Sequence, residues 1–218
     1  MTLRSELDAF KASWLERVGA ETAKMVEDDN AALKTLAAGA LKAGVMFPAA
    51  KLPDQKGGMT DLAALMAEGP VVVTFYRGGW CPYCNLELRA FQTLLPEIEG
   101  LGARLVAISP ETPDNSLSTA EKNALAFDVL SDSEGLLADA LGIRFELSEA
   151  MKAYFVKVGH DLPARNGDDK WSLPMPATYV VAKGGRIMLA HVDPDYRTRL
   201  DPSMALATLR GLTAAKAA

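Results

Sequence analysis

The chain has 218 residues, 49% of them hydrophobic, and its formal net charge at pH 7 is −5. This length predicts one domain, or one domain with an extension, and the hydrophobic content is enough to build a buried core. The acidic balance argues against nucleic-acid binding, because phosphate groups are recognised by basic surfaces.

The sequence indicates neither a targeting segment nor a membrane segment. Its first eight residues lack the apolar run of a secretory signal, and no stretch of about 18 apolar residues is present to span a membrane. The chain contains two cysteines. Because cysteines in a reducing compartment more often serve chemistry than cross-linking, we expect a cytoplasmic protein.

Residues 1–45 are predicted to form an N-terminal helical extension to a main domain of residues 46–218. Apolar residues recur at steps of three and four between residues 3 and 43, which predicts two helices with a break near Gly19 or at residues 28–30. We expect the extension to pack on the main domain or on a partner subunit, which leaves a homodimer open. A specific binding arm is the alternative.

Strand and helix patterns alternate through the main domain. A short strand and turn are predicted at residues 52–58, with further strands at 71–76, 104–109, 127–130, 177–181 and 187–192. Helices are predicted at 61–66, from 85 onward, and at 116–125, 134–141, 148–158 and 202–214. Residues 159–174 are polar, and we expect them to be irregular.

This order of elements predicts an α/β fold. Strands that alternate with helices form a parallel sheet, and the turn at residues 183–186 joins the last two strands as an antiparallel hairpin. The expected architecture is therefore a three-layer α/β/α arrangement around a mixed central sheet.

Both cysteines lie in the tetrapeptide Cys81-Pro82-Tyr83-Cys84, between an apolar strand and a helix. The pair thus occupies a strand-to-helix turn at the carboxyl end of a strand, where α/β sheets place their sites. The partial positive charge of a helix N-terminus favours a thiolate, and Arg77 would add to it. The second cysteine can then resolve a mixed disulfide or a sulfenic acid formed on the first.

Other uses of the two cysteines are less favoured. A disulfide here would close a four-residue ring and constrain little of the unfolded chain. Structural zinc needs four ligands, yet the sequence has no second C-x-x-C motif, and His160 and His191 are isolated. Two inert core thiols stay open as an alternative to redox chemistry. No metal or other cofactor is expected.

Several segments resemble the AhpC/TSA group of peroxiredoxin-like proteins, within the thioredoxin superfamily. The similarity covers about residues 47–202 and is carried by residues 52–58, 69–76, 105–110 and 176–187. It implies a thioredoxin-like fold and an oxidoreductase that acts through thiols. A charged run at residues 193–199 resembles a segment recurring in such proteins, and we expect it to be a surface loop or an oligomer contact.

The resemblance gives the two cysteines different roles, depending on the relative. The sequence from Trp80 to Cys84 is similar to the thioredoxin and glutaredoxin signature, in which the first cysteine attacks and the second resolves. Peroxiredoxins show P-x-x-x-T-x-x-C instead. When this chain is aligned with that pattern, Arg77 stands where the pattern has proline and Cys81 stands where it has threonine. Cys84 then aligns with the peroxidatic cysteine, and Glu87 with a glutamate that often follows it.

The hairpin strand also departs from the peroxiredoxin pattern. Peroxiredoxins bring an arginine from this strand to the peroxide, and the matching region here has Pro176. Thioredoxins have a cis-proline at that place, so the resemblance implies a cis peptide bond between Met175 and Pro176. Without the threonine and the arginine, Arg77 would have to supply the positive charge near a bound peroxide.

Three functions follow as hypotheses. In the first, the protein is a thiol-dependent peroxidase: Cys84 attacks a peroxide, Cys81 condenses with the sulfenic acid to form a disulfide, and a thioredoxin- or glutathione-type thiol reduces it. In the second, it is a disulfide oxidoreductase without efficient peroxidase activity, with Cys81 attacking. A redox sensor is the third. Trp80 would flank or shield the disulfide, and Glu87 would assist proton transfer or favour the helix start.

Overall fold

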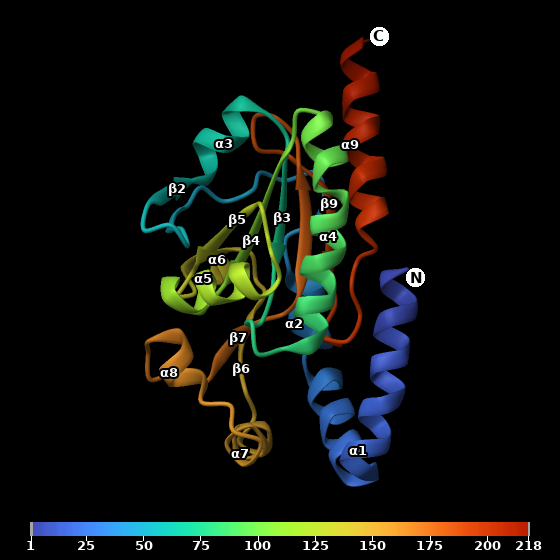
Figure 1. Ribbon diagram of the computed structural model, residues 1–218, viewed down its shortest axis with the longest axis vertical. Coiled ribbons are helices and arrows are strands. Elements are labelled where there is room, and N and C mark those ends of the chain that lie inside the picture. The colour runs from blue at the N-terminus through green and yellow to red at the C-terminus, as the bar shows by residue number, and fades with distance from the viewer. Residues whose placement is uncertain (1, 218) are drawn as a thin grey trace.

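A computed structural model describes residues 2–217, with side chains described for residues 2–214. A five-stranded sheet forms its centre (Figure 1), with the strands in the order β5-β4-β3-β8-β9. Its strands are β3 (Val71–Phe75), β4 (Arg104–Ser109), β5 (Asp128–Ser131), β8 (Ala177–Val181) and β9 (Ile187–Val192). Strands β3, β4 and β5 are parallel, whereas β8 and β9 pair antiparallel. The predicted mixed sheet is confirmed.

Helices cover both faces of the sheet. Alternate side chains of the central strand β3 are therefore buried in two separate hydrophobic clusters, one on each face. Val72 packs in a cluster with α4 (Pro82–Gly100) and α9 (Pro202–Ala217). Val71, Val73 and Phe75 pack on the opposite face with α3 (Leu62–Glu68) and α6 (Leu136–Ala140). All five side chains of β3 are buried, as expected for a central strand covered on both sides. This confirms the predicted three layers.

The N-terminal residues form a long kinked helix, α1 (Leu3–Ala32), followed by a short helix, α2 (Lys34–Gly39). Thr2 caps α1 by accepting a hydrogen bond from the backbone N–H of Ser5. The kink falls at Gly19, whose φ of 77° is readily adopted only by glycine, so the predicted break near this residue is confirmed.

Helix α1 packs on the main domain of the same chain. Leu3 and Leu7 are buried in the cluster of α4, and Val26 is buried beside α7 (Glu149–Lys157). The extension therefore has its partner surface within this chain, and a homodimer stays a prediction.

Two small antiparallel sheets and two short helices complete the molecule. One sheet joins β1 (Lys51–Pro53) to β2 (Met59–Asp61), and the other joins β6 (Arg144–Glu146) to β7 (Ser172–Pro174). The short helices are α5 (Pro113–Lys122) and α8 (Leu162–Asn166). None of the helices in residues 2–217 is long and apolar enough to cross a lipid bilayer.

The prediction that residues 159–174 are irregular was wrong, since this segment contains α8 and β7. Asp161 caps α8 by accepting a hydrogen bond from the backbone N–H of Ala164, and Gly167 ends the helix in the left-handed conformation. Leu162 is fully buried and holds the helix on the domain. A helix this short shows no apolar periodicity, which is why the sequence pattern missed it.

Candidate active site

The cysteine pair lies on the turn between β3 and α4, as the sequence predicted. Cys81 is the N-cap of α4, Pro82 opens the helix, and Cys84 belongs to its first turn. The backbone N–H of Cys81 donates to the Gly78 carbonyl at 3.1 Å, which closes the turn just before the helix. Both cysteines are free thiols and both are buried.

Asn85 fixes the shape of this turn, a role that no sequence motif indicates. Its side-chain amide donates to the Gly79 carbonyl at 2.9 Å and to the Cys81 carbonyl at 3.1 Å. The amide of Asn123 in turn donates to the Asn85 carbonyl oxygen at 2.8 Å. Because Asn85 is buried, these bonds hold the Gly79–Cys81 backbone in one conformation.

Gly78 is required by the geometry of the turn. Its φ of +145° is strained for any other residue, and a Cβ atom here would overlap Nε1 of Trp80. We expect Gly78→Ala to lower the free energy of unfolding by about 1–3 kcal/mol in urea titrations. Gly211→Ala is the matched control, since α9 has open space there and alanine favours a helix. Equal stability of the two variants would contradict a requirement for glycine at position 78.

The two thiols have opposite tendencies to ionise. Burial opposes ionisation of Cys81, but the hydrogen bond from the Cys84 thiol and the charges of Arg77 and Arg199 outweigh it and lower the pKa of Cys81 to about 5. Burial and the neighbouring Cys81 raise the pKa of Cys84 well above its ordinary value. The site therefore favours ionisation of Cys81 over ionisation of Cys84.

Arg199 is a site residue that the sequence analysis missed. It lies between β9 and α9, is buried, and donates through Nη2 to Sγ of Cys84 at 3.4 Å. Its Nε lies 3.2 Å from Oε2 of Glu87, also buried. Burial raises the pKa of Glu87 to about 7, although the Arg199 charge opposes this rise. The expectation of a surface loop at residues 193–199 was wrong for Arg197 and Arg199, which are both buried, and an oligomer contact there stays a prediction.

Arg199 also supplies the positive charge that peroxiredoxins bring to the peroxide with an arginine of the hairpin strand. Arg77 was predicted to supply the replacement charge, whereas the guanidinium next to Cys84 comes from Arg199. These two residues are 115 positions apart in the chain. Local pattern cannot show such a contact, because only the packing of the segment after β9 against α4 creates it.

Arg77 has a different environment, made of aromatic rings. Its guanidinium carbon lies 4.0 Å from the ring centre of Tyr196, 5.1 Å from that of Trp80 and 5.6 Å from that of Phe155. The side chain is buried, and its backbone N–H donates to Sγ of Cys84 at 3.4 Å. Arg77 therefore brings a positive charge to the pair, and no carboxylate in the described part of the chain forms an ion pair with it.

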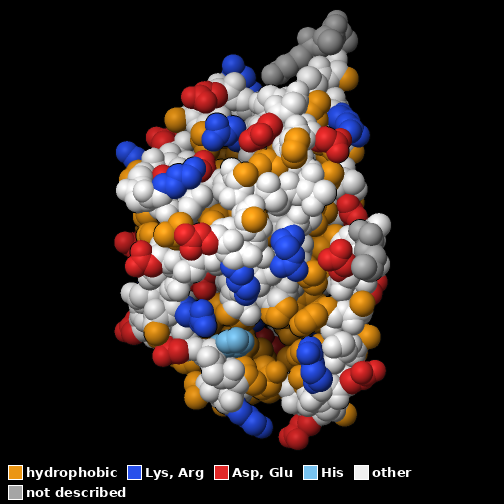
Figure 2. All heavy atoms as spheres, viewed as in Figure 1, with side chains coloured by type: hydrophobic (Ala, Val, Ile, Leu, Met, Phe, Trp, Pro, Cys, Tyr) orange, Lys and Arg blue, Asp and Glu red, His pale blue; other side chains and the backbone are white. Residues whose placement is uncertain are grey.

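A groove of about 460 Å³ opens onto Cys81 but not onto Cys84. Aromatic side chains dominate its lining: Phe10, Trp14, Trp80, Tyr83, Tyr154, Phe155 and Tyr196. Figure 2 shows hydrophobic side chains gathered around a hollow in the lower part of the molecule, between α1 and α7. Its volume suits a small organic molecule, and the first sulfur that such a molecule meets is that of Cys81.

Trp80 and Pro176 are the remaining predicted site residues. Trp80 lines the groove beside Cys81 and packs edge-on against Phe155, with ring centres 5.4 Å apart. Pro176 instead lines a separate small cavity that it shares with Arg77.

The peptide bond between Met175 and Pro176 is trans, so the implied cis bond was wrong. The backbone N–H of Met175 donates to the Ile143 carbonyl at 2.7 Å, and the Pro176 carbonyl accepts from the backbone N–H of Asp193 at 3.4 Å. These contacts lead the chain into β8 in an extended form.

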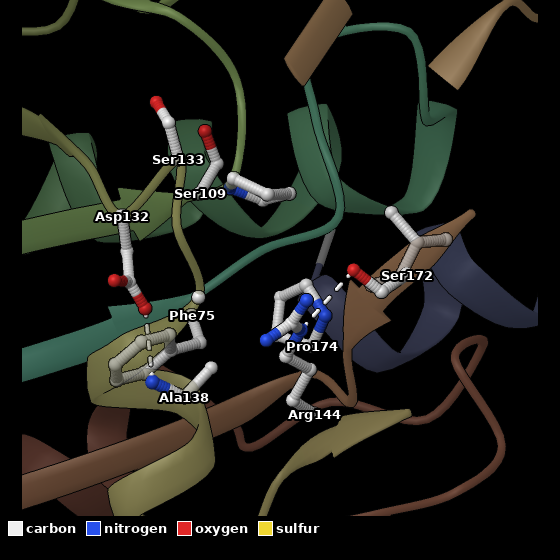
Figure 3. Close-up of a pocket in the computed structure, with 11 residues that line it drawn as sticks. Phe75, Ser109, Asp132, Ser133, Ala138, Arg144, Ser172 and Pro174 are labelled. Carbon is white, nitrogen blue, oxygen red and sulfur yellow. Dashed lines mark hydrogen bonds between the residues drawn. The ribbon is translucent and has the colours of Figure 1, made fainter. Parts of the chain in front are cut away.

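A second cavity, on the other side of the sheet, is too small to be a substrate site. Figure 3 shows Asp132 directed at the backbone N–H of Ala138, 2.9 Å away, and Arg144 directed at the Ser172 hydroxyl, 3.1 Å away. Its volume of about 10 Å³ has room for roughly one water molecule. The polar groups here cap α6 and tie β6 to β7, and no thiol lines the cavity.

A mixed sheet whose central strand leads into a helix that begins at a pair of cysteines defines a class, the thioredoxin-like oxidoreductases that act through thiols. Comparison with known proteins identifies the family. The family model described as AhpC/TSA matches residues 43–190. The chain therefore belongs to the AhpC/TSA family.

Individual relatives agree with this assignment. The chain is 31% identical over 114 residues to peroxiredoxin Bcp of Escherichia coli, covering 52% of this chain and 72% of that protein. It is 26% identical over 144 residues to the chloroplastic peroxiredoxin Q of Sedum lineare, covering 66% and 65%. The crystal structure of peroxidoxin BcpB from Mycobacterium tuberculosis matches with a TM-score of 0.62 at 25% identity, covering 79% and 98%.

These relatives confirm the thioredoxin-like fold and show an oxidoreductase of the peroxiredoxin type, which implies a peroxide substrate and a thiol reductant in general terms. The stretch matched by the family model ends at residue 190 and begins at residue 43. It therefore includes both cysteines but neither Arg199 nor α1, the two parts of the site that the sequence analysis did not foresee.

Proposed function

We propose that this protein is a thiol-dependent peroxidase in which Cys81 attacks the peroxide and Cys84 resolves the product. The observation that carries the proposal is the asymmetry of the pair: Cys81 lines the groove and has a lowered pKa, whereas Cys84 lies behind it with a raised one. This order differs from the hypothesis drawn from the peroxiredoxin pattern, in which Cys84 attacks.

The chemistry proceeds in two steps within the protein. The Cys81 thiolate attacks one peroxide oxygen, the O–O bond breaks, and the leaving alkoxide takes a proton from solvent, so that Cys81 becomes a sulfenic acid and the peroxide an alcohol. The Cys84 thiol then attacks the Cys81 sulfur, forming the disulfide and releasing water. Residues three apart in a helix have Cα atoms about 5 Å apart, which is within the range that a disulfide spans.

Regeneration requires two electrons from outside the chain. A thioredoxin- or glutathione-type thiol would attack the disulfide, restore both thiols and leave as a disulfide itself. Such reductants are abundant in the cytoplasm, where we place the protein. Arg77 and Arg199 stabilise the Cys81 thiolate, and Trp80 forms the groove wall beside it. Glu87 sets the position of Arg199, while Pro176 supports the cavity around Arg77.

Stoichiometry tests the proposal on the wild-type protein. We expect one equivalent of hydrogen peroxide to consume both thiols of the reduced protein and to form one intramolecular disulfide, measured by thiol titration and by mass spectrometry of the intact chain. Dithiothreitol or thioredoxin should then sustain peroxide consumption. A reduced protein whose thiols survive excess peroxide would refute a peroxidase.

A disulfide oxidoreductase is the second candidate, and one observation favours it. Cys81 is the N-cap of α4 and lies beside Trp80, as the first cysteine does in the thioredoxin-like signature. In that case the reduced protein would exchange rapidly with an aromatic disulfide dye, and its reaction with peroxide would be slow.

A further inference from the structure

A buried carboxylate contacts the cysteine turn without lining the groove. Glu111 lies in the loop between β4 and α5 and is 1% exposed. Its Oε2 atom accepts a hydrogen bond from the backbone N–H of Gly79 at 2.8 Å. Because Gly79 stands two residues before Cys81, this bond joins the loop after β4 to the backbone that leads into α4.

The turn is held at Gly79 from both sides of the residue. The N–H of Gly79 donates to Glu111, whereas its carbonyl accepts from Asn85 at 2.9 Å and from Nζ of Lys122 at 3.3 Å. Asn85 belongs to α4 itself, and Lys122 of α5 is exposed. The buried bond to Glu111 is therefore the firmer link between the turn and a neighbouring element.

The turn also lies in close contact with this loop and with α5. A Cβ atom on Gly79 would overlap Oγ1 of Thr119, and one on Gly78 would lie 3.0 Å from Cδ of Glu111. Two adjacent glycines therefore let the backbone approach the carboxylate closely enough for a short hydrogen bond.

Glu111 is itself held in place. Its backbone N–H donates to the Ser109 hydroxyl at 3.3 Å, and Nη1 of Arg165 lies 3.9 Å from its Oε1. The carbonyl of Arg165 accepts from the backbone N–H of Thr112 at 3.1 Å and from the Asn115 amide at 2.9 Å. Since these bonds tie α8 to the start of α5, Arg165 is kept beside the carboxylate, which can serve as a fixed support for the turn.

The charge of Glu111 changes in the neutral pH range. Burial raises the pKa of Glu111 to about 7, although the hydrogen bond from Gly79 and the charge of Arg165 oppose this rise. Cys81 adds a smaller rise, because a thiolate and a carboxylate repel each other. Tyr76, which also faces Glu111, stays neutral because burial raises its pKa. The hydrogen bond to Gly79 thus favours an ordered turn, while the carboxylate charge opposes the thiolate.

We infer that Glu111 is a positioning residue for Cys81: by binding the Gly79 N–H, it fixes the turn that places the Cys81 sulfur at the start of α4 and in the lining of the groove. Glu111 does not line the groove and acts on the reaction through Gly79. This inference rests on the proposed attack by Cys81 and adds a residue that supports it.

Two substitutions separate the hydrogen bond from the charge. Glu111→Gln removes the charge and keeps an oxygen that accepts from Gly79, whereas Glu111→Ala removes both. The loss of charge is common to the two variants, so the difference between them measures the hydrogen bond. We expect the acid ionisation constant of Cys81, followed by the ultraviolet absorbance of the thiolate, to be about tenfold smaller in Glu111→Ala than in Glu111→Gln.

The rate constant with hydrogen peroxide at pH 7 should follow the same order. We expect about a tenfold loss in Glu111→Ala and a value within about twofold of wild type in Glu111→Gln. Glu121 of α5 is exposed and provides the matched control, so Glu121→Gln and Glu121→Ala should both behave as wild type.

A purely structural role would give a different result. Glu111→Ala would then have a lower free energy of unfolding, but the folded protein would keep the ionisation constant and the rate constant of Glu111→Gln, and the inference would be overturned. Equal losses in the two variants would overturn it as well, because they would show that the charge acts and the hydrogen bond does not.

A measurement on the wild-type chain decides the question if Glu111→Ala does not fold. In NMR spectra of the reduced protein, the amide proton of Gly79 should shift with a midpoint near pH 7 as Glu111 ionises, and Glu111→Gln should abolish this transition. A Gly79 amide without such a transition in wild type overturns the inference. Neither this titration nor the ionisation constant of Cys81 needs a peroxide, so a wild type inert to peroxide would refute the peroxidase and leave the test of Glu111 intact.

Discussion

Replacing Cys81 with serine is expected to lower the rate constant for reaction with hydrogen peroxide by roughly a thousandfold or more, because a serine hydroxyl does not ionise at neutral pH. Cys84→Ser should keep the first reaction within a few-fold of wild type and lose the disulfide. Its Cys81 sulfenic acid would then accumulate, and dimedone trapping with peptide mass spectrometry would locate it. Both changes are nearly isosteric, so the two variants control for each other.

The opposite pattern would reverse the order of attack. If Cys84→Ser abolished the first reaction and Cys81→Ser preserved it, Cys84 would be the peroxidatic residue, as the peroxiredoxin pattern places it. The groove would then have to open toward Cys84 before reaction, since Cys84 is fully buried and does not line it.

The pH dependence of the first step identifies the same thiol independently. The reacting form is the thiolate, and the pKa of Cys81 is about 5, well below the value of about 8.5 for a free cysteine. The rate constant should therefore be constant from about pH 6 to pH 8 and fall about tenfold per pH unit below pH 5. A rate constant that instead rises through pH 8–9 would show an unstabilised thiol.

The fold was predictable because its strongest signals are local. Residues 71–76 form one apolar run, and β3 is buried on both faces, so composition alone identifies it as a central strand. The helix start after Cys81 has an equally local cause, since Pro82 suits the first helical position. The short helix α8 was missed because one capping aspartate and one buried leucine carry too little pattern.

The site was predictable only in part, for a geometric reason. Two arginines stand two residues apart in the run at 193–199, yet Arg197 pairs with Asp195 and Glu27, whereas Arg199 contacts Cys84 and Glu87. Nothing in the sequence of residues 193–199 indicates which of the two arginines contacts the cysteine pair. Packing of the segment against α1 on one side and α4 on the other assigns their roles.

The order of attack was ambiguous for a related reason. Counted along the sequence, Cys81 matches a thioredoxin-type nucleophile and a peroxiredoxin threonine equally well. Both cysteines are buried, and what distinguishes Cys81 from Cys84 is its place in the lining of the groove between α1 and α7, together with the charges of Arg77 and Arg199. All of these are tertiary features, and pattern matching cannot reach them.

The pair of Arg199 and Glu87 gives the second large effect, this time on stability. Arg199→Met keeps most of the side-chain volume but leaves the Glu87 carboxylate buried without its counter-charge. Removing one partner of a buried ion pair costs about 3–5 kcal/mol. We expect urea titrations at pH 8 to show a loss of this size, and the double variant Glu87→Gln/Arg199→Met to recover a large part of it, because a neutral amide tolerates burial better than a carboxylate.

The pH dependence distinguishes a lost charge pair from lost packing. Burial already raises the pKa of Glu87 to about 7 with Arg199 present, and removing that charge raises it further above the ordinary value of 4.5. Between these values the folded state binds a proton that the unfolded state has released, so the free energy of unfolding of Arg199→Met falls as the pH rises.

In a Cys81→Ser background, which removes the titration of that thiol, Arg199→Met should approach the stability of the double variant at pH 5 and fall well below it at pH 8. A deficit that is equal at both pH values would show that Arg199 stabilises the protein by packing alone, and its charge would then have to act on the Cys81 thiolate and not on Glu87.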